Sequence, residues 1–319
     1  KETKVPVEVV DDDGPIIEPT FKAWWGVPDM PKINFKNDGA RQWALDVTEH
    51  WIKNFDIDGW RMDVAKELDF SFWKDFRDVA YSAKKDILLI SEIFGDTSQW
   101  LQGERFDGTM NYSFRETMTD YFATKRIDNK EFSNSLANLY SMYSFEALSS
   151  CQNLLSSHDV KRFLNRCGAN TDGMFGAVFL QATFPGIAGI YYGDEIGLGG
   201  ADDPFNREPF PWESEDKWNK DLLKFTSELM NIKTSQPILR YGNFEMVTYD
   251  DNYVIFRRVL NDESLLCIVN RDLNSKDIEL STNAHSVDIV YGDCTIELDS
   301  GKLKIKDIAD NFGIIIKES

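Results

Sequence analysis

Short apolar runs alternate with longer amphipathic segments from about residue 35 to residue 236. The apolar runs have the length and composition of strands, and the segments between them show helical periodicity. Such a succession predicts an α/β fold with a parallel sheet and helices outside it. The predicted strands are 58–64, 87–90, 108–112, 153–157 and 187–192. The predicted helices begin at 38 and otherwise cover 72–80, 113–124, 173–183 and 217–235.

Two of these helices have apolar residues on a single face. In the first, Trp43, Val47 and Trp51 share one face at helical spacing. In the second, Phe72, Phe76 and Val79 are expected to point inward.

The pattern of apolar and polar residues changes after Pro237. Short β-branched and aromatic runs at 249–259, 264–269 and 286–291 are separated by Asn, Asp and Gly, which predicts an antiparallel β domain. We therefore expect three parts: an irregular, Pro- and Asp-rich segment at 1–34, an α/β domain at 35–237 and an all-β domain at 238–319.

Composition and charge exclude several kinds of protein. The chain has 319 residues, of which 42% are hydrophobic and 13% aromatic, so it is not a disordered acidic protein. Its formal net charge of −19 repels nucleic acid and anionic membranes but leaves a neutral sugar unaffected. No apolar run approaches the roughly 20 residues that a membrane span needs.

The four cysteines carry no metal-binding pattern. Cys151, Cys167, Cys267 and Cys294 include no CxxC pair and no His at ligand spacing, so no zinc site is predicted. They could form two disulfides, but their scatter over a large domain favours reduced, buried thiols.

Three carboxylates stand where predicted strands end. Asp63 follows the first strand, Glu92 the second and Asp159 the strand at 153–157, with Arg61 and His158 beside them. Each of these residues has a simpler explanation. Most acidic residues are solvated, and Asp159 could cap a helix. A lone histidine such as His158 is often structural. Their convergence favours chemistry, because active sites of parallel βα folds lie at the carboxyl ends of the strands. Cleavage of a glycosidic bond with retention uses such a pair of carboxyl groups.

These segments resemble a known family. Gly59-Trp60-Arg61-Met62-Asp63-Val64-Ala65 resembles the strand-four motif of the α-amylase family of glycoside hydrolases (family 13). Ser91-Glu92-Ile93-Phe94-Gly95 resembles its strand-five motif, and the stretch from Leu154 to Asp159 its strand-seven motif. The order and spacing also match. The resemblance implies a (β/α)8 TIM barrel, of which this chain holds strands four to eight, followed by a C-terminal antiparallel β-sandwich domain.

The same resemblance implies a role for each residue. Asp63 would be the nucleophile, Glu92 the general acid/base and Asp159 a transition-state stabiliser. Arg61 would support Asp63, and His158 would contact the reacting sugar. Asp203 and Arg207 match the strand-eight loop and would bind glucose on the non-reducing side, although a surface ion pair closing a loop is the simpler explanation.

Finer matches point to the cyclomaltodextrinase, neopullulanase and maltogenic amylase subgroup. They are Trp24-Trp25-Gly26, the run from Met30 to Asn34, the run from Trp100 to Gly103, and the run from Phe106 to Tyr112. The subgroup usually has Asn-Glu after Val-Ala of strand four, where this chain has Lys66-Glu67, and a lysine there resembles ordinary α-amylases. Lys66 and Glu67 would contact substrate, and the choice among cyclodextrin, pullulan and linear maltodextrin stays open.

The resemblance also implies what the protein needs and where it acts. No cofactor is required and no metal ligand is predicted. A calcium ion is common in the family, but its usual ligands lie upstream, and the run Asp11 to Asp13 is only a weak candidate. We expect an α-glucan oligosaccharide substrate, no nucleic-acid or membrane partner, and a cytoplasmic rather than a secreted protein.

The family's strand-three motif and its first three strands do not occur in this chain. We therefore expect a fragment or one part of a nicked enzyme, weakly active or inactive alone. Its open strand edge would be covered by the missing N-terminal part or by a second copy in a homo-oligomer. The alternative to an enzyme is an inactive fragment or a non-catalytic, glucan-binding partner of the same fold.

Overall fold

A computed structural model of the protein describes residues 21–272, 276–308 and 312–319. These residues form two compact units, residues 21–92 with 104–106, and residues 93–103 with 107–319. The division into three parts at 34 and 237 stays a prediction. The run Asp11 to Asp13 lies outside the described residues.

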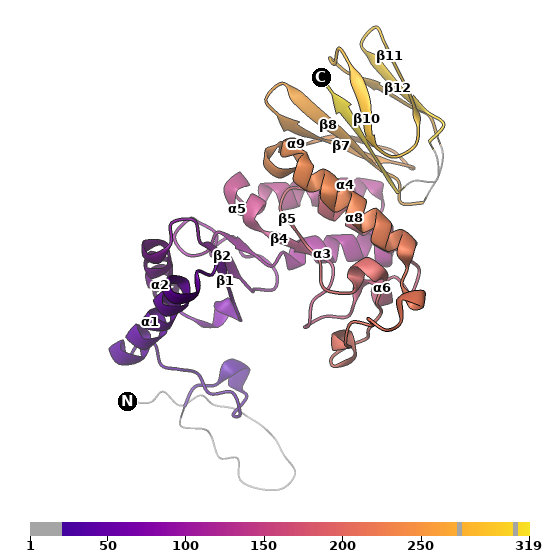
Figure 1. The fold of residues 1–319 in the computed structure, drawn as a ribbon. Coiled ribbons are helices and arrows are strands. Elements are labelled where there is room, and N and C mark those ends of the chain that lie inside the picture. Colours follow the sequence, from indigo (N-terminus) through magenta and orange to yellow (C-terminus); the bar gives the residue numbers. More distant parts are fainter. Residues whose placement is uncertain (1–20, 273–275, 309–311) are drawn as a thin grey trace. The chain divides into compact units, whose positions relative to one another are not determined.

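The first unit is built around two parallel strands (Figure 1). Their register runs from Gly59 opposite Leu88 to Met62 opposite Ser91. A Cβ on Gly59 would lie 2.4 Å from the carbonyl oxygen of Leu88, so this close approach requires glycine. The elements of the unit are η1 (Trp24–Gly26), α1 (Asp38–Phe55), β1 (Gly59–Met62), η2 (Ala65–Glu67), α2 (Phe70–Ala83) and β2 (Leu88–Ser91).

Helices α1 and α2 pack against each other through aromatic and charged contacts. Arg41 of α1 pairs with Asp75 of α2 at 2.7 Å and lies 5.7 Å from the ring centroid of Phe72. Phe35, just before α1, stacks on the same ring with centroids 4.4 Å apart. Phe72 and Phe76 are buried as predicted, whereas Val79 is only partly buried.

The aromatic face of α1 is not its core face. Trp43 and Trp51 are 58% and 44% exposed, and the buried residues of the helix are Leu45, Thr48 and Ile52. The spacing therefore identified an apolar stripe correctly, but α1 packs within its unit through the other side.

The second unit begins with further strands and helices of the α/β pattern. β4 and β5 run parallel, and Met110 forms a parallel bridge with Gln152 next to β3, as the predicted parallel arrangement requires. The predicted helix 113–124 is split into α3 and a π-helical turn, η3. The strands are β3 (Gly108–Thr109), β4 (Gln152–Leu154) and β5 (Ile187–Gly189). The helices and turns are α3 (Tyr112–Met118), η3 (Thr119–Ala123), α4 (Asn129–Ser141), α5 (Phe145–Ser150), α6 (Phe163–Arg166), α7 (Asp172–Thr183), η4 (Asp194–Ile196), η5 (Phe205–Arg207), η6 (Glu215–Lys217), α8 (Lys220–Ser235) and α9 (Pro237–Tyr241).

The unit ends in two antiparallel sheets, ordered β10-β13-β8-β7-β6 and β11-β12-β9 (Figure 1). Side chains of both sheets share one hydrophobic cluster, which includes Ile255, Leu266, Leu303 and Ile316. This matches the predicted β-sandwich. The strands are β6 (Asn243–Tyr249), β7 (Val254–Leu260), β8 (Glu263–Val269), β9 (Ile278–Ser281), β10 (Val287–Tyr291), β11 (Thr295–Asp299), β12 (Lys302–Lys306) and β13 (Gly313–Glu318).

The predicted β run at 249–259 is not one continuous strand, since it covers the end of β6, a turn and most of β7. A turn separates β6 from β7, because the carboxylate of Asp250 accepts the main-chain N–H groups of Asn252 at 2.7 Å and Tyr253 at 2.8 Å. This is the way an Asp side chain stabilises a turn.

Two buried cations bond to main-chain carbonyls at helix ends, one from the β sheet and one from α8. Arg258 of β7 is fully buried and donates to the carbonyls of Thr183, Leu239 and Gly242. Lys233 of α8 donates to the carbonyls of Ala182 at 3.1 Å and Phe184 at 3.3 Å. These carbonyls include the end of α7 and lack helical partners, so the cations complete their hydrogen bonding.

Two further results concern disulfides and membrane spans in the described residues. All four cysteines lie in the described residues and none forms a disulfide, as predicted, although only Cys151 and Cys267 are fully buried. None of the helices in the described parts of the chain is long and apolar enough to cross a membrane.

Lys233 predicts a pH dependence of stability. Burial, together with the charge of Arg258, lowers the pKa of Lys233 from 10.5 to about 7. Between these two values the unfolded chain binds more protons than the folded one, so this group makes the folded state more stable as the pH rises. We expect Lys233→Met to remove this contribution, which has a slope of up to about 1.4 kcal/mol per pH unit.

Urea unfolding of both proteins from pH 7 to pH 9.5 measures the effect. The exposed Lys224 of the same helix provides the matched control, Lys224→Met. A difference between wild type and Lys233→Met that stays constant over this range would contradict the prediction.

Candidate active site

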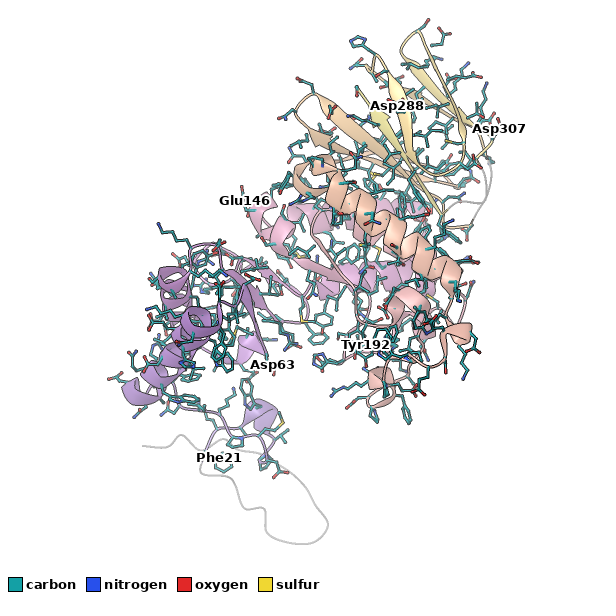
Figure 2. All side chains as sticks on the ribbon, viewed as in Figure 1. Phe21, Asp63, Glu146, Tyr192, Asp288 and Asp307 are labelled. Carbon is teal, nitrogen blue, oxygen red and sulfur yellow. The ribbon has the colours of Figure 1, made fainter. Side chains whose placement is uncertain are left out.

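The first group of candidate residues lies where β1 and β2 end. Arg61 belongs to β1, Asp63 directly follows that strand, and Glu92 directly follows β2. Because Met62 pairs with Ser91 in the parallel register, the two acids leave the same edge next to each other. Figure 2 labels Asp63 at this edge.

One guanidinium group contacts both acids. Nη1 of Arg61 lies 2.5 Å from Oδ1 of Asp63, and Nη2 lies 3.4 Å from Oε1 of Glu92. The side chain of Asp63 is 72% exposed, whereas that of Glu92 is 7% exposed. The site thus holds two carboxyl groups in contrasting surroundings, fixed by one cation.

The main chain after β1 is bent so that it binds Glu92. Val64 has φ 44° and ψ 45°, a left-handed conformation that costs a β-branched residue on the order of 1–3 kcal/mol. In this conformation its N–H donates to Oε2 of Glu92 at 2.8 Å. The N–H of Ala65 donates to the main-chain oxygen of Glu92 at 3.2 Å. The strained turn therefore orients the acid.

Lys66 and Glu67 lie in η2, directly after this turn. Nζ of Lys32 forms an ion pair with the carboxylate of Glu67 and lies 5.1 Å from the ring centroid of Trp24. The indole of the buried Trp73 donates to the carbonyl of Ala65 at 2.8 Å and holds the other end of η2. Lys66 is exposed.

The second group of candidate residues lies in the second unit, after β4. Nε2 of His158 lies 3.0 Å from Oδ2 of Asp159. Arg207 lies beside both, since its Nη2 is 3.6 Å from Oδ1 of Asp159 and its Nε donates to the carbonyl of His158 at 2.9 Å. Nε of Arg207 is also 3.0 Å from Oδ1 of Asp203. These four predicted residues therefore form one cluster.

Asn206 organises this cluster and was missed by the sequence analysis. It is fully buried, and its Nδ2 lies 2.9 Å from the carbonyl oxygens of both His158 and Val160. The amide thus ties η5, which carries Arg207, to the loop that carries Asp159. The only sequence signal was its place between Asp203 and Arg207, beside two residues that were singled out.

A second set of hydrogen bonds holds the loop that carries Asp159. Oγ of Ser157 accepts the N–H of Asp159 at 3.2 Å and lies 3.2 Å from the hydroxyl of the buried Tyr112. The ring of Tyr112 stacks on Phe94, which is 54% exposed, with centroids 3.7 Å apart. Asp159 is therefore linked to an exposed aromatic ring through two side chains.

A buried ion pair lies next to this group. Nη1 of Arg162 donates to the carbonyl of Tyr192 at 2.7 Å and lies 3.4 Å from Oδ1 of Asp194. Burial raises the pKa of Asp194 to about 7, although a hydrogen bond from Ser156 and the charge of Arg162 oppose the shift. Figure 2 labels Tyr192, whose ring centroid lies 4.8 Å from the guanidinium.

The structure thus collects the predicted residues in two clusters. Arg61, Asp63 and Glu92 belong to the first unit, and Asp159 belongs to the second. The meeting of the three carboxyl groups in one site stays a prediction. In the described parts of the chain, no group of three or more His, Cys, Asp and Glu side chains is arranged to hold a metal ion.

Comparison with known proteins identifies the family. Residues 20–242 match the family model of the α-amylase catalytic domain, so the chain belongs to the α-amylase family. Family and structural likeness together support a TIM-barrel fold with a C-terminal antiparallel sheet domain.

Individual relatives belong to the subgroup that the motifs indicated. The chain is 39% identical over 246 residues to neopullulanase 2 of Thermoactinomyces vulgaris, covering 76% of this chain and 42% of that protein. It is 35% identical over 261 residues to an intracellular maltogenic amylase of Bacillus subtilis (strain 168), covering 81% and 44%. A solved cyclomaltodextrinase structure matches with a TM-score of 0.86 and 30% identity, covering 98% of this chain and 53% of that one. The chain spans less than half the length of the two curated relatives.

Asn206 provides a test of how the Asp159 loop is held. Asn206→Leu keeps the volume but leaves the buried carbonyls of His158 and Val160 without this donor. An unsatisfied buried polar group costs about 1–3 kcal/mol, so we expect a loss of about 2–4 kcal/mol in the free energy of unfolding. Chemical denaturation measures it, with Asn231→Leu on the exposed side of α8 as the matched control. Equal stability of the two variants would refute this role.

Proposed function

We propose that the protein is a retaining α-glucan hydrolase and transglycosylase that cleaves α-1,4-glucosidic bonds in maltodextrins and cyclodextrins. The observation that carries this proposal is Arg61, which holds the exposed carboxylate of Asp63 and the buried carboxyl group of Glu92 at one strand edge. Two carboxyl groups in contrasting surroundings are what a nucleophile and an acid/base require. The relatives named neopullulanase, maltogenic amylase and cyclomaltodextrinase support the substrate class.

In the proposed first step, an oxygen of Asp63 attacks the anomeric carbon of the sugar. Glu92 donates its proton to the glycosidic oxygen, the bond to that oxygen breaks, and the leaving sugar departs with a new hydroxyl group. The product is a glycosyl ester on Asp63. Arg61 holds the attacking carboxylate of Asp63 in a fixed position.

In the second step, Glu92 acts as a base. It takes a proton from water while the water oxygen attacks the anomeric carbon, and the ester bond to Asp63 breaks. A hydroxyl group of another sugar can replace the water, which gives transfer instead of hydrolysis. Both reactions use the same residues, so the acceptor decides the outcome.

The cluster around Asp159 would bind the reacting sugar. Asp159 accepts hydrogen bonds from sugar hydroxyls, and His158 and Arg207 hold its carboxylate in position. Asp203, paired with Arg207, would contact the neighbouring glucose on the non-reducing side. Lys66 and Glu67 would contact the leaving-group side.

This assignment implies a place for each strand in the barrel. We infer that β1 to β5 are strands four to eight, and that three further strands complete the closed sheet. Bonds of the α-1,6 type are a second substrate class to be tested. Similarity to a relative named as intracellular supports a cytoplasmic location.

The alternative is a glucan-binding relative without activity. Both proposals predict binding, but only an enzyme turns over substrate. Calorimetry with maltoheptaose, combined with a reducing-end assay, separates them, because binding without product would favour the non-catalytic protein.

Asp63→Asn tests the nucleophile directly. In the protein at its natural length, we expect turnover of β-cyclodextrin, pullulan and soluble starch to fall by at least about a thousandfold, because an amide cannot form the ester. Glucan binding and thermal stability should be retained. Asp58→Asn, at the exposed residue directly before β1, is the matched control. Activity of Asp63→Asn close to that of the control would show that Asp63 is not the nucleophile.

Lys32 provides a test of the leaving-group side. Lys32→Met removes the cation that holds Glu67, so Glu67 should no longer be fixed for contact with the sugar. We expect KM for maltotriose to rise several-fold with kcat within about twofold, and Lys32→Arg to restore most of the affinity. The exposed Lys36→Met is the control. An unchanged KM in Lys32→Met would show that Glu67 does not contact the substrate.

A further inference from the structure

The inner face of the sandwich changes from apolar to polar toward one end. On β7, β8 and β13 the inward residues alternate with outward ones, and Ile255, Ile268 and Ile314 belong to the hydrophobic cluster. Further along the same faces lie Arg257 on β7, Ser264 on β8 and Glu318 on β13. In the same register, Glu245 of β6 stands opposite Arg257.

This polar end lines a cavity of about 620 Å³ that is open to solvent. Such a volume lies in the range of sites for small molecules and short oligosaccharides. The cavity lies entirely within the β strands and connections of the second unit, and it includes none of the candidate catalytic residues. Its polar lining includes Glu245, Arg257, Ser264, Thr282, His285 and Glu318.

The floor of the cavity is fixed by charge-assisted hydrogen bonds. Glu318, with a side chain only 4% exposed, accepts from Nε of Arg257 at 2.6 Å and from Nη2 at 3.0 Å. The hydroxyls of Thr282 and Ser264 also donate to it, at 2.8 Å and 2.9 Å. Glu318 is thus fully paired. Nη1 of Arg257 takes no part in this pairing, and the side chain is 21% exposed, so a donor remains for a ligand in a position set by the ion pair.

The charges around the cavity restrict the ligand. Glu245, Asp262 and Glu263 line it together with the paired Arg257, so an anion such as a phosphate would be repelled. Asn261, Ser281 and Asn283 add amides and a hydroxyl, which both donate and accept hydrogen bonds. A neutral ligand rich in hydroxyl groups fits this mixture of donors and acceptors.

We propose that this cavity is a second glucan-binding site, which holds a neutral α-glucan chain on the β domain. This inference rests on the proposed function for the identity of the sugar. A second site matters for long chains, because a polymer bound there is held at a high effective concentration near the rest of the protein. Short substrates, which cannot reach both sites at once, gain nothing from it.

Hydrogen exchange measured by mass spectrometry locates the binding. In the Asp63→Asn protein, maltoheptaose should slow exchange in peptides covering 257–266 and 281–286, whereas cellohexaose should not. Val259→Trp places a large ring in the cavity without changing the ion pair and should abolish the slowing. Thr248→Trp, on an exposed position of β6, should not.

A second variant keeps the result interpretable if Val259→Trp folds poorly. The double change Arg257→Met and Glu318→Met removes the polar floor at similar volume, a replacement that proteins often tolerate. It should also abolish the slowing. No slowing in the parent protein, or slowing that persists in both cavity variants, overturns the inference.

Kinetics of otherwise unmodified enzymes separate this inference from the proposed function. Val259→Trp should raise KM for soluble starch several-fold and leave kcat/KM for maltotriose within about twofold. If maltotriose is turned over but the cavity peptides show no protection, the second site is wrong and the enzyme assignment stands. If maltotriose is not turned over but the peptides are protected, the second site stands and the enzyme assignment fails.

Discussion

The contact of the Arg61 guanidinium with the carboxyl groups of Asp63 and Glu92 depends on how the rest of the first unit is built. Arg61 can reach both Asp63 and Glu92 only because β1 and β2 are parallel and in register, so that both acids leave the same edge. Gly59 allows the strands to approach this closely. Helices α1 and α2 then supply the packing that keeps the strand pair in place. Without Arg61, the two acids would stand side by side with no cation to fix their positions.

The strained turn at Val64 has a reason in the same arrangement. A left-handed β-branched residue is unfavourable, and such strain persists where the surroundings compensate for it. Here the compensation is visible, since the N–H of Val64 binds the carboxylate of Glu92 and the indole of Trp73 fixes Ala65. In the second unit, Asn206 and Ser157 hold Asp159 by comparable hydrogen bonds. Both clusters thus consist of charged groups positioned by the main chain and by buried neutral side chains.

The sequence was sufficient to predict what depends on local pattern. The approximate strand positions, the parallel pairing and the places of Asp63 and Glu92 directly after their strands followed from apolar runs and from where they stop. Asp159 lies five residues beyond β4, which is shorter than predicted. The turn at Asp250 was missed because the apolar residues on either side read as one continuous strand, although Asp250-Asp251-Asn252 was a turn signal. The exposed stripe of α1 shows a further limit, since periodicity finds an apolar face but not what covers it. Helix α4 was also passed over, despite its capping box of Asp128 and Glu131.

What could not be predicted depends on contacts between distant segments. Asn206, Arg162 and Lys32 are unremarkable in sequence, and their roles follow from partners 30 to 48 residues away. The polar end of the sandwich was equally hidden, because Arg257 and Glu318 meet only when β7 and β13 are placed on either side of β8. Such residues have no local signature, and only the folded chain identifies them.

The most direct test of the account is to identify the residue that carries the glycosyl ester. The protein at its natural length would be incubated with 5-fluoro-α-D-glucosyl fluoride, which slows the second step so that the ester accumulates, and then digested and mapped by mass spectrometry. We expect a fluoroglucosyl adduct on Asp63. An adduct on Glu92, on Asp159 or on any other carboxylate would contradict it.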